Sequence, residues 1–184
     1  MKDVPQGRHV RVLFQDESRF GRISDLRRCW GPLPKRPEAG QQVIREFVYS
    51  IGAVCPGDGA LSSLIMPWVD AEIMSLFLAH TAREFAGDFC ILFLDSAGWH
   101  IAKNLRVPRS MKLLYLPPYS PQLNPIEHIW DHIRENHFSN RVFSSLDDVE
   151  NTLSAALKGL SAMPETVKSM TNFHWLNTLC LLYN

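Results

Sequence analysis

The sequence predicts an α/β domain built on a mixed five-stranded sheet, and three observations lead to this fold class. Five short stretches rich in aliphatic, β-branched and aromatic residues are strand candidates, each bounded by turn-forming residues. The first three follow one another without an intervening helix, whereas the later ones alternate with helical patterns. The chain has 184 residues, of which 46% are hydrophobic and 21% charged, as in ordinary globular proteins. We therefore expect a single domain over residues 1–184.

The first expected strand, Val10–Gln15, alternates in hydrophobicity and ends at an acidic residue, Asp16. Residues 17–44 follow as an irregular basic insertion rich in Gly and Pro. Its segment Trp30–Pro37 contains three prolines, so it cannot form a regular helix or a central strand.

A hairpin and a buried strand come next. Phe47–Val54 and Ala60–Met66 are strands joined by a turn cluster of Pro, Gly and Asp. Asp70 is a typical N-cap for a helix whose apolar residues recur at helical spacing. The apolar run Phe89–Leu94 is short and uninterrupted, which favours a central strand buried on both faces, and it ends abruptly at Asp95.

The remaining elements complete the alternation of strands and helices. Ile101–Arg106 is compatible with a short helix, and Met111–Leu116 with another buried strand. A helix is expected to start near Asn124. A further helix from Ser145 has leucines and a valine on one face and begins a C-terminal helical part over residues 145–184.

Three carboxylates stand where these elements begin or end. Asp16 and Asp95 each follow a strand, and Glu127 lies in the first turn of the helix after Asn124. Oxygen ligands from three separate elements suit Mg²⁺ or Mn²⁺, which can support phosphoryl transfer without a nucleophilic side chain. Each acid also has a structural explanation. A strand exit favours Asp as a turn residue, and Asn124-Pro125 followed by Glu127 matches a capping box.

Histidines offer other interpretations. His100 follows Asp95 by five residues, and it is either a buried structural histidine or a group that orients Asp95 or a phosphate. His128 and His132 have the spacing of a zinc-binding helix but lack its catalytic Glu, so a zinc hydrolase is the weaker hypothesis. The four cysteines are scattered, which indicates reduced thiols rather than a disulfide framework or a zinc site.

Charge is unevenly distributed, although the formal net charge is zero. Residues 1–45 contain ten Lys and Arg against five Asp and Glu, whereas residues 46–184 contain nine against fourteen. A basic loop beside an acidic pocket is typical of phosphate contact, but a solvated surface loop explains the charge equally well. The candidate DNA-binding side chains in the insertion are Arg19, Arg22, Arg27, Arg28, Lys35 and Arg36.

Three motifs make a specific resemblance. They read QDESRFGR from Gln15, LDSAGWH from Leu94 and LPPYSPQLNPIEHIW from Leu116. They resemble the catalytic domain of bacterial insertion-sequence transposases of the mariner-like superfamily, within the retroviral-integrase-like enzymes that carry a DDE carboxylate triad. The resemblance extends over most of the chain and implies an RNase H-like fold, with helices on both faces of the sheet.

This resemblance implies that Asp16, Asp95 and Glu127 are the triad and hold Mg²⁺ or Mn²⁺, with two ions expected. His100 matches a histidine common after the second aspartate, and Asn124 precedes the third acid as a possible accessory residue. The 31 residues between Asp95 and Glu127 are slightly fewer than is usual in the superfamily. Such proteins usually carry an N-terminal helix-turn-helix region. We expect that region to be supplied by a separate reading frame, or to be missing from a remnant.

The expected function is metal-dependent DNA cleavage and strand transfer at the ends of an insertion element. The expected partners are DNA, a helix-turn-helix region and a second copy in a homodimer. No apolar run approaches the roughly 18 residues of a membrane span, so we expect a cytoplasmic protein. Two alternatives remain: a catalytically silent DNA-binding or dimerisation remnant, and another nuclease of the RNase H fold.

Overall fold

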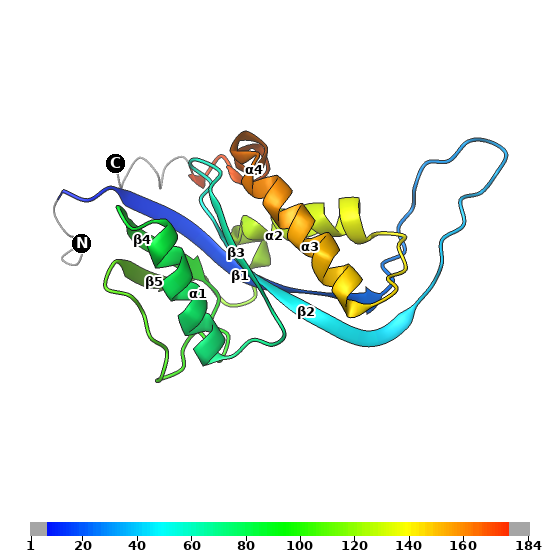
Figure 1. Cartoon of the computed structure of the whole chain (residues 1–184). Helices are drawn as coiled ribbons and strands as arrows, with labels where there is room; N and C mark the ends of the chain where they lie inside the picture. The colour runs from blue at the N-terminus through cyan, green and yellow to red at the C-terminus, as the bar shows by residue number, and fades with distance from the viewer. Residues whose placement is uncertain (1–6, 177–184) are drawn as a thin grey trace.

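Five strands form one mixed sheet in the order β3-β2-β1-β4-β5 (Figure 1), in a computed structural model that describes residues 7–176. β1, β2 and β3 pair antiparallel, whereas the pairs β1–β4 and β4–β5 are parallel. This arrangement confirms the predicted fold class. The strands are β1 Val10–Ile23, β2 Val43–Val54, β3 Leu61–Met66, β4 Phe89–Leu94 and β5 Met111–Tyr115.

β1 is the longest strand, and it changes partner along its length. Its first five residues pair with β4, and the remainder continues beyond β4 paired only with β2. The prediction that this strand ends at Gln15 is therefore wrong, because Asp16 lies inside it. Burial of Ser18 and Phe20 continues the two-residue period, while Arg19 between them is exposed. The run of polar residues from Asp16 to Arg19 resembles a turn in the sequence.

A projecting arm, residues 24–42, replaces the predicted insertion of residues 17–44. β1 ends later and β2 begins earlier than predicted, so both ends of the predicted insertion belong to strands. Figure 1 shows the arm extending well beyond the sheet. A short bridge between Asp25 and Ser139 ties its base to the segment before α3, the helix Leu146–Ser161. The proline-rich tip is irregular, as the sequence predicts.

Helices cover both faces of the sheet (Figure 1), as the resemblance implies. α1, Ala71–Glu84, packs on one face and is capped by Asp70, whose side chain accepts two backbone N–H groups. The opposite face is covered by α2 Ile126–Ile133, α3 and α4 Pro164–Thr171. α3 begins where the sequence predicts, and Ser145 caps it.

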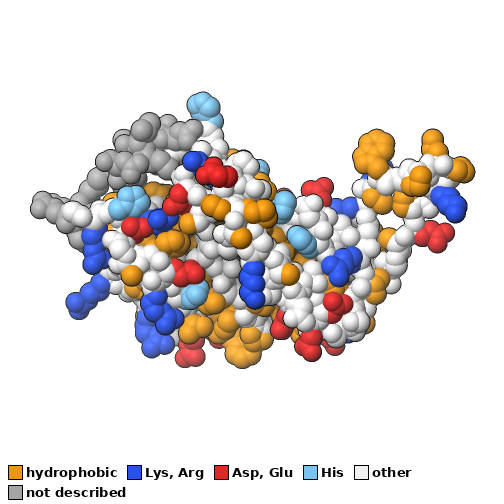
Figure 2. All heavy atoms as spheres, turned by 45° about the horizontal axis from the view of Figure 1, so that its top comes forward, with side chains coloured by type: hydrophobic (Ala, Val, Ile, Leu, Met, Phe, Trp, Pro, Cys, Tyr) orange, Lys and Arg blue, Asp and Glu red, His pale blue; other side chains and the backbone are white. Residues whose placement is uncertain are grey.

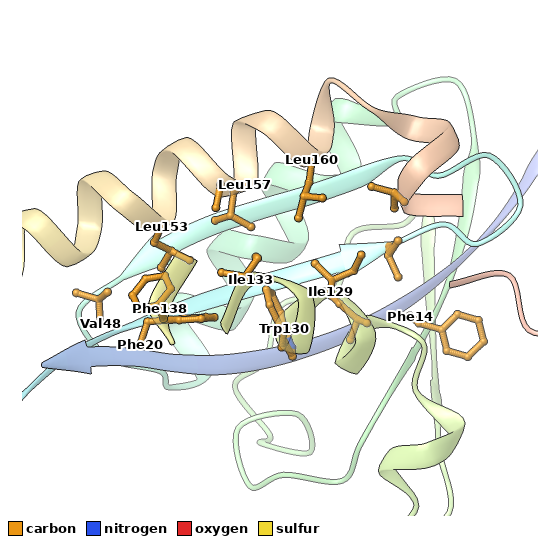
Figure 3. Close-up of a cluster of buried hydrophobic side chains, with 14 of the residues drawn as sticks. Phe14, Phe20, Val48, Ile129, Trp130, Ile133, Phe138, Leu153, Leu157 and Leu160 are labelled. Carbon is orange, nitrogen blue, oxygen red and sulfur yellow. The ribbon is translucent and has the colours of Figure 1, made fainter. Parts of the chain in front are cut away.

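The larger core cluster lies between the sheet and α2, α3 and α4 (Figure 3). The apolar face of α2 is completely buried, since Ile126, Ile129, Trp130 and Ile133 are all 0% exposed. Trp130 contacts the ring of Phe20 edge-on, so the core extends under the second half of β1. Burial of four large side chains fixes how α2 lies on the sheet.

One predicted helix is absent from the described residues. The segment over residues 101–106 forms turns, with a single turn bond from Leu105 N–H to the Ala102 carbonyl. The backbone N–H of Arg106 is instead bonded to Ser75 Oγ on α1 at 3.0 Å. Cys180 and the end of the predicted C-terminal helical part lie outside the described residues. None of the described helices is long and apolar enough to cross a lipid bilayer.

Candidate active site

Asp16, Asp95 and Glu127 line one pocket of about 410 Å³ at the end of β4. They reach it from three elements: β1, the residue after β4, and the first turn of α2. Phe14 is paired with Phe93 across the parallel strands. Asp16 lies two residues after Phe14, and Asp95 lies two residues after Phe93. The two acids therefore lie side by side, at the same position along the neighbouring segments. The three acids predicted from sequence are thus neighbours in space.

Asp16 is a largely buried carboxylate, and among the described residues no cation forms an ion pair with it. Burial raises its pKa to about 8, and repulsion from Glu17 and Glu127 adds to the shift. A hydrogen bond from Trp130 Nε1 to Asp16 Oδ2, at 2.9 Å, opposes the shift only in part. Burial therefore disfavours the charged form of Asp16, and a cation bound in the pocket would favour it.

Asp95 is held by one of its two carboxylate oxygens. Oδ1 accepts the backbone N–H of Ala97 at 2.9 Å and Nδ1 of His100 at 2.7 Å. The side chain is 58% exposed. In the described part of the chain, the hydrogen bonds to this carboxylate all fall on Oδ1, so Oδ2 remains available to a ligand.

Glu127 is not part of a capping box, so that prediction is wrong. Pro125 is the N-cap of α2, and no side chain caps this helix. Asn124 is buried, and its Nδ2 donates to the carbonyl of Gln15 at 2.9 Å, which braces the start of α2 against β1. The carboxylate of Glu127 is therefore free of a capping role and lines the pocket.

The three acids form an anionic, oxygen-only donor set that fits Mg²⁺ or Mn²⁺. Burial raises the pKa of Glu127 as it does that of Asp16, and the charge of Arg134 opposes this only in part. Within residues 7–176, no three His, Cys, Asp or Glu side chains already converge as a metal-binding cluster. The acids would therefore hold an ion together with water molecules, as is usual for Mg²⁺.

His100 is bonded to Asp95 of the pocket and is 1% exposed. Its Nδ1 bonds Asp95, and its Nε2 lies 3.5 Å from Glu17 Oε2. Burial lowers the pKa of His100, but contacts with Glu17 and Asp95 outweigh burial and raise the pKa overall. Of the roles considered for His100 from sequence, the structure shows direct contact with Asp95.

The family follows from a match over most of the chain. The family model described as DDE superfamily endonuclease matches residues 11–150, a range that contains all three acids. The chain belongs to the DDE superfamily of endonucleases. The three letters of that name denote two aspartates and a glutamate, the residue types that line the pocket.

Relatives of this DDE-superfamily chain include one of unknown function and one transposase. An uncharacterized protein, y4pE/y4sA, of Sinorhizobium fredii is 39% identical over 130 residues, which cover 70% of this chain and 96% of that protein. The Tcb2 transposase of Caenorhabditis briggsae is 30% identical over 99 residues, which cover 48% of this chain and 36% of that protein.

Solved structures of the Mos1 mariner transposase share the fold. A pre-cleavage Mos1 transpososome matches with a TM-score of 0.60 at 14% identity, over 88% of this chain and 55% of that chain. A Mos1 paired-end complex with Mn matches with a TM-score of 0.58, also at 14% identity, over 89% and 56%. This chain therefore spans about half of Mos1, and its fold is the RNase H-like fold of transposase catalytic domains. The family match confirms the predicted DDE superfamily, and the Mos1 structures confirm the predicted fold.

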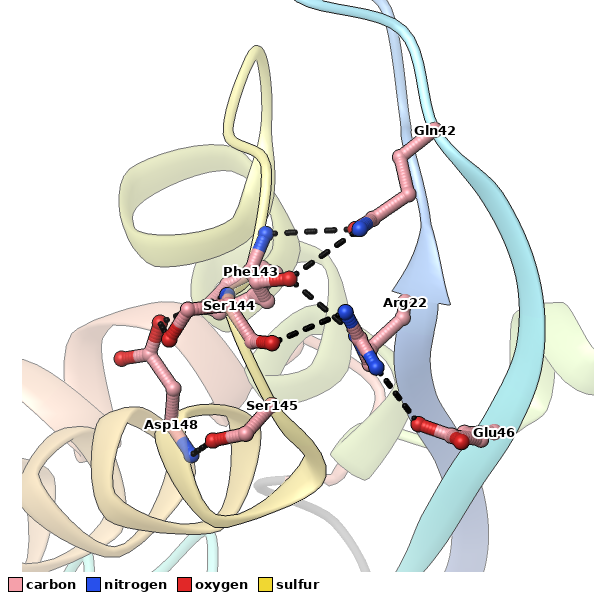
Figure 4. A network of polar contacts seen from close by, with 7 residues as sticks. All are labelled: Arg22, Gln42, Glu46, Phe143, Ser144, Ser145 and Asp148. Atoms are coloured by element: carbon pink, nitrogen blue, oxygen red, sulfur yellow. Dashed lines mark hydrogen bonds and ion pairs between the residues drawn. The ribbon is translucent and has the colours of Figure 1, made fainter.

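Arg22 has a structural role in this DDE-superfamily chain (Figure 4). Its Nε donates to the carbonyl of Phe143 at 3.1 Å, and its Nη2 to the carbonyl of Ser144 at 2.9 Å. Its Nη1 pairs with Glu46 at 2.7 Å. Because its side chain is only 15% exposed and its nitrogens are engaged, Arg22 braces the base of the arm and is not free for phosphate contact.

The other candidate DNA-binding residues lie on or near the arm. Arg19 stacks on the ring of Phe47, and Arg27 pairs with Asp25 at 2.8 Å. Figure 2 shows hydrophobic side chains gathered at the arm tip beside a few charges, so the tip is mixed rather than simply basic. Trp30 and Leu33 are almost fully exposed there. The exposed cations on the arm include Arg28, Lys35 and Arg36.

The zinc hypothesis gains no support from the helix on which it rests. His128 packs edge-on against the ring of Phe173, and the His132 carbonyl accepts Nδ2 of Asn136 at 2.8 Å. Both are ordinary helix positions. The thiols in the described residues are free: Cys55 and Cys90 are buried, and Cys29 is exposed.

Three residues around the site were missed from sequence. Trp130 lies in the core, and its indole N–H also holds Asp16. Gly52 is paired with Asp16 across β1 and β2, and its missing side chain leaves room for the Trp130 ring. Glu17 contacts His100. Only Glu17 had a local signal, its position directly after Asp16.

Proposed function

We propose that this chain catalyses metal-dependent DNA cleavage and strand transfer at the ends of an insertion element. The observation that carries the proposal is the meeting of Asp16, Asp95 and Glu127 in one pocket. The family match and the transposase relative support the same chemistry. A carboxylate pocket of this kind needs no nucleophilic side chain, because hydrolysis and transesterification both use an oxygen nucleophile from outside the protein.

In this proposal, Asp16 and Asp95 would hold two divalent ions, and Glu127 would complete the donor set. When bound, Mg²⁺ or Mn²⁺ would supply the positive charge that activates a water or a 3′-hydroxyl and stabilises the leaving oxygen of a phosphodiester. The protein supplies position: Trp130 fixes Asp16 Oδ2, and His100 fixes Asp95 Oδ1. Burial raises the pKa of Asp16 to about 8, so a bound ion would be needed to favour its carboxylate form at neutral pH.

DNA is the proposed partner, and the arm is its proposed contact surface. Arg19, Arg27, Arg28, Lys35 and Arg36 remain the proposed phosphate contacts. Mos1 transposase has been solved as a strand transfer complex and as a paired-end complex with a transposon end. Those complexes support DNA binding and a homodimer for this chain. A helix-turn-helix partner region stays a prediction.

The two alternatives are less well supported. A catalytically silent remnant has no need to keep three acids in one pocket, where Asp16 and Glu127 repel each other. Another nuclease of the RNase H fold would have the same sheet topology as this chain. The family match and the Tcb2 relative nevertheless favour a transposase.

The test is Asp95→Asn in a cleavage assay. The wild-type chain is expected to cut DNA that carries the element's terminal repeats in Mn²⁺ or Mg²⁺, but not in EDTA. Asp95→Asn removes a ligand charge and is expected to lower the rate by about 10²–10³-fold, the usual effect of losing one transition-state stabilising group. Asp70→Asn is the matched control, since Asn caps α1 about as well as Asp. Full Mn²⁺-dependent cleavage by Asp95→Asn would contradict the proposal.

A further inference from the structure

Glu17 is a fourth carboxylate close to the pocket, and it is not one of the triad. It follows Asp16 on β1, so its side chain lies on the other face of the sheet. It does not line the pocket, and its side chain is 12% exposed. Its Oε2 accepts Nε2 of Gln15 at 3.2 Å, a contact that holds the carboxylate in one orientation. Glu17 is therefore placed to act on the site only through a neighbour.

His100 is that neighbour, and it spans the space between two carboxylates. Its Nδ1 donates to Asp95 Oδ1 at 2.7 Å, and its Nε2 lies 3.5 Å from Glu17 Oε2. The side chain is 0% exposed, and Nε2 has no hydrogen-bond partner among the described residues, so Glu17 is the group that meets this buried nitrogen. The backbone is also held, since Tyr115 Oη donates to the His100 carbonyl at 3.0 Å.

We propose that Glu17 is a positioning residue that fixes Asp95 through His100, and thereby sets how tightly the pocket binds a divalent ion. The inference rests on the proposed function, because it requires Asp95 to be a ligand. An imidazole bonded at one nitrogen can pivot about that bond, whereas a carboxylate at the opposite nitrogen stops the pivot. Groups that orient ligands in this way commonly change metal affinity by about 10–100-fold.

Asp95 is the acid that most needs this support. It follows the last residue of β4, and its side chain is 58% exposed. Asp16, by contrast, is held within a strand and by the indole of Trp130. Contacts from Glu17 to His100 and from His100 to Asp95 therefore connect Asp95 to β1, the strand that also carries Asp16.

The test measures Mn²⁺ affinity by the electron paramagnetic resonance signal of free Mn²⁺. Glu17→Gln is expected to raise the dissociation constant about tenfold, with an unchanged circular dichroism spectrum. Glu84→Gln is the matched control, because Glu84 also lies 3.5 Å from a histidine nitrogen, that of His80 on α1, at the surface. Its dissociation constant is expected to equal that of the wild-type chain. Equal Mn²⁺ affinity of Glu17→Gln and the wild-type chain would overturn the proposal.

A double variant separates action through His100 from a general loss of structure. His100→Asn keeps an N–H that can reach Asp95 but cannot reach Glu17. If Glu17 acts through the ring, adding Glu17→Gln to His100→Asn causes no further loss of affinity. Losses that multiply would overturn the inference while leaving the proposed function intact. A wild-type chain that binds no Mn²⁺ would overturn both.

Discussion

Asp16→Asn is expected to abolish DNA cleavage and, at the same time, to make the metal-free protein more stable. The carboxylate is largely buried, and its raised pKa of about 8 shows that its charge is disfavoured in the folded chain. Asn carries no charge, yet its Oδ1 can still accept the indole N–H of Trp130, so the contact with α2 is retained. Removing a functional charge of this kind commonly stabilises a protein by about 0.5–2 kcal/mol.

The gain in stability of Asp16→Asn is expected to grow as the pH rises. The ordinary pKa of 3.8 applies to the unfolded chain, and about 8 to the folded one. Folded wild-type protein therefore binds the extra proton between about pH 4 and pH 8, and its free energy of unfolding falls as the pH rises through that window. The free energy of unfolding of Asp16→Asn does not fall in this way, because Asn does not titrate. The difference in free energy of unfolding between the variant and the wild-type chain should therefore be largest above pH 8 and should vanish near pH 4.

Calorimetry in EDTA at pH 5 and pH 8.5 measures this difference. At pH 8.5 the melting temperature of Asp16→Asn should exceed that of the wild-type chain by about 2–6 °C, as expected for a domain of this size. Mn²⁺ should raise the melting temperature of the wild-type chain and leave that of the variant unchanged. Asp70→Asn should melt like the wild-type chain in EDTA and should still be stabilised by Mn²⁺. If Asp16→Asn melts below the wild-type chain at pH 8.5, the buried charge of Asp16 does not destabilise the folded protein and the prediction is wrong.

Gly52→Ala is expected to disturb the same acid from the neighbouring strand. A Cβ at Gly52 would lie 2.8 Å from Cη2 of Trp130 and 3.0 Å from Cδ1 of Ile126. Both side chains are fully buried, so neither can move aside cheaply. Overpacking of this kind costs about 1–3 kcal/mol. Because the displaced indole also holds Asp16, cleavage should fall together with stability.

Gly159→Ala is the matched control for that substitution. Gly159 lies inside α3, and a Cβ there meets no atom within 4 Å. Ala favours a helix over Gly by about 1 kcal/mol, so the same chemical change should stabilise the protein. Urea denaturation of both variants measures the free energy of unfolding. Equal effects of the two substitutions would show that the space at Gly52 is not needed by Trp130.

Two of the carboxylates could be predicted from sequence because each stands beside a strong local signal. An uninterrupted apolar run points to Asp95, and a proline-rich lead into an amphipathic helix points to Glu127. The contact between Trp130 and Asp16 has no such signal, since 114 positions separate the two residues. Spatial proximity of that kind is set by how α2 packs on the sheet.

Two local predictions failed because tertiary contacts displaced them. The pattern Asn-Pro-Ile-Glu matches a capping box, but Asn124 bonds the Gln15 carbonyl on β1 instead. The polar residues after Asp16 resemble a turn, but pairing with β2 extends the strand to Ile23. In both cases the backbone found a partner far away in sequence, which local pattern cannot reveal.

The contacts of Arg22 at the end of β1 separate this strand from the arm, so the two can evolve at different rates. Arg22 lies six residues beyond Asp16, roughly 20 Å along β1, and it is bonded to the carbonyls of Phe143 and Ser144. Insertions, deletions or substitutions beyond these contacts, in the tip of the arm, leave the register of β1 at Asp16 unaltered. New DNA or protein contacts can therefore arise on the arm while the chemistry of the pocket stays constant.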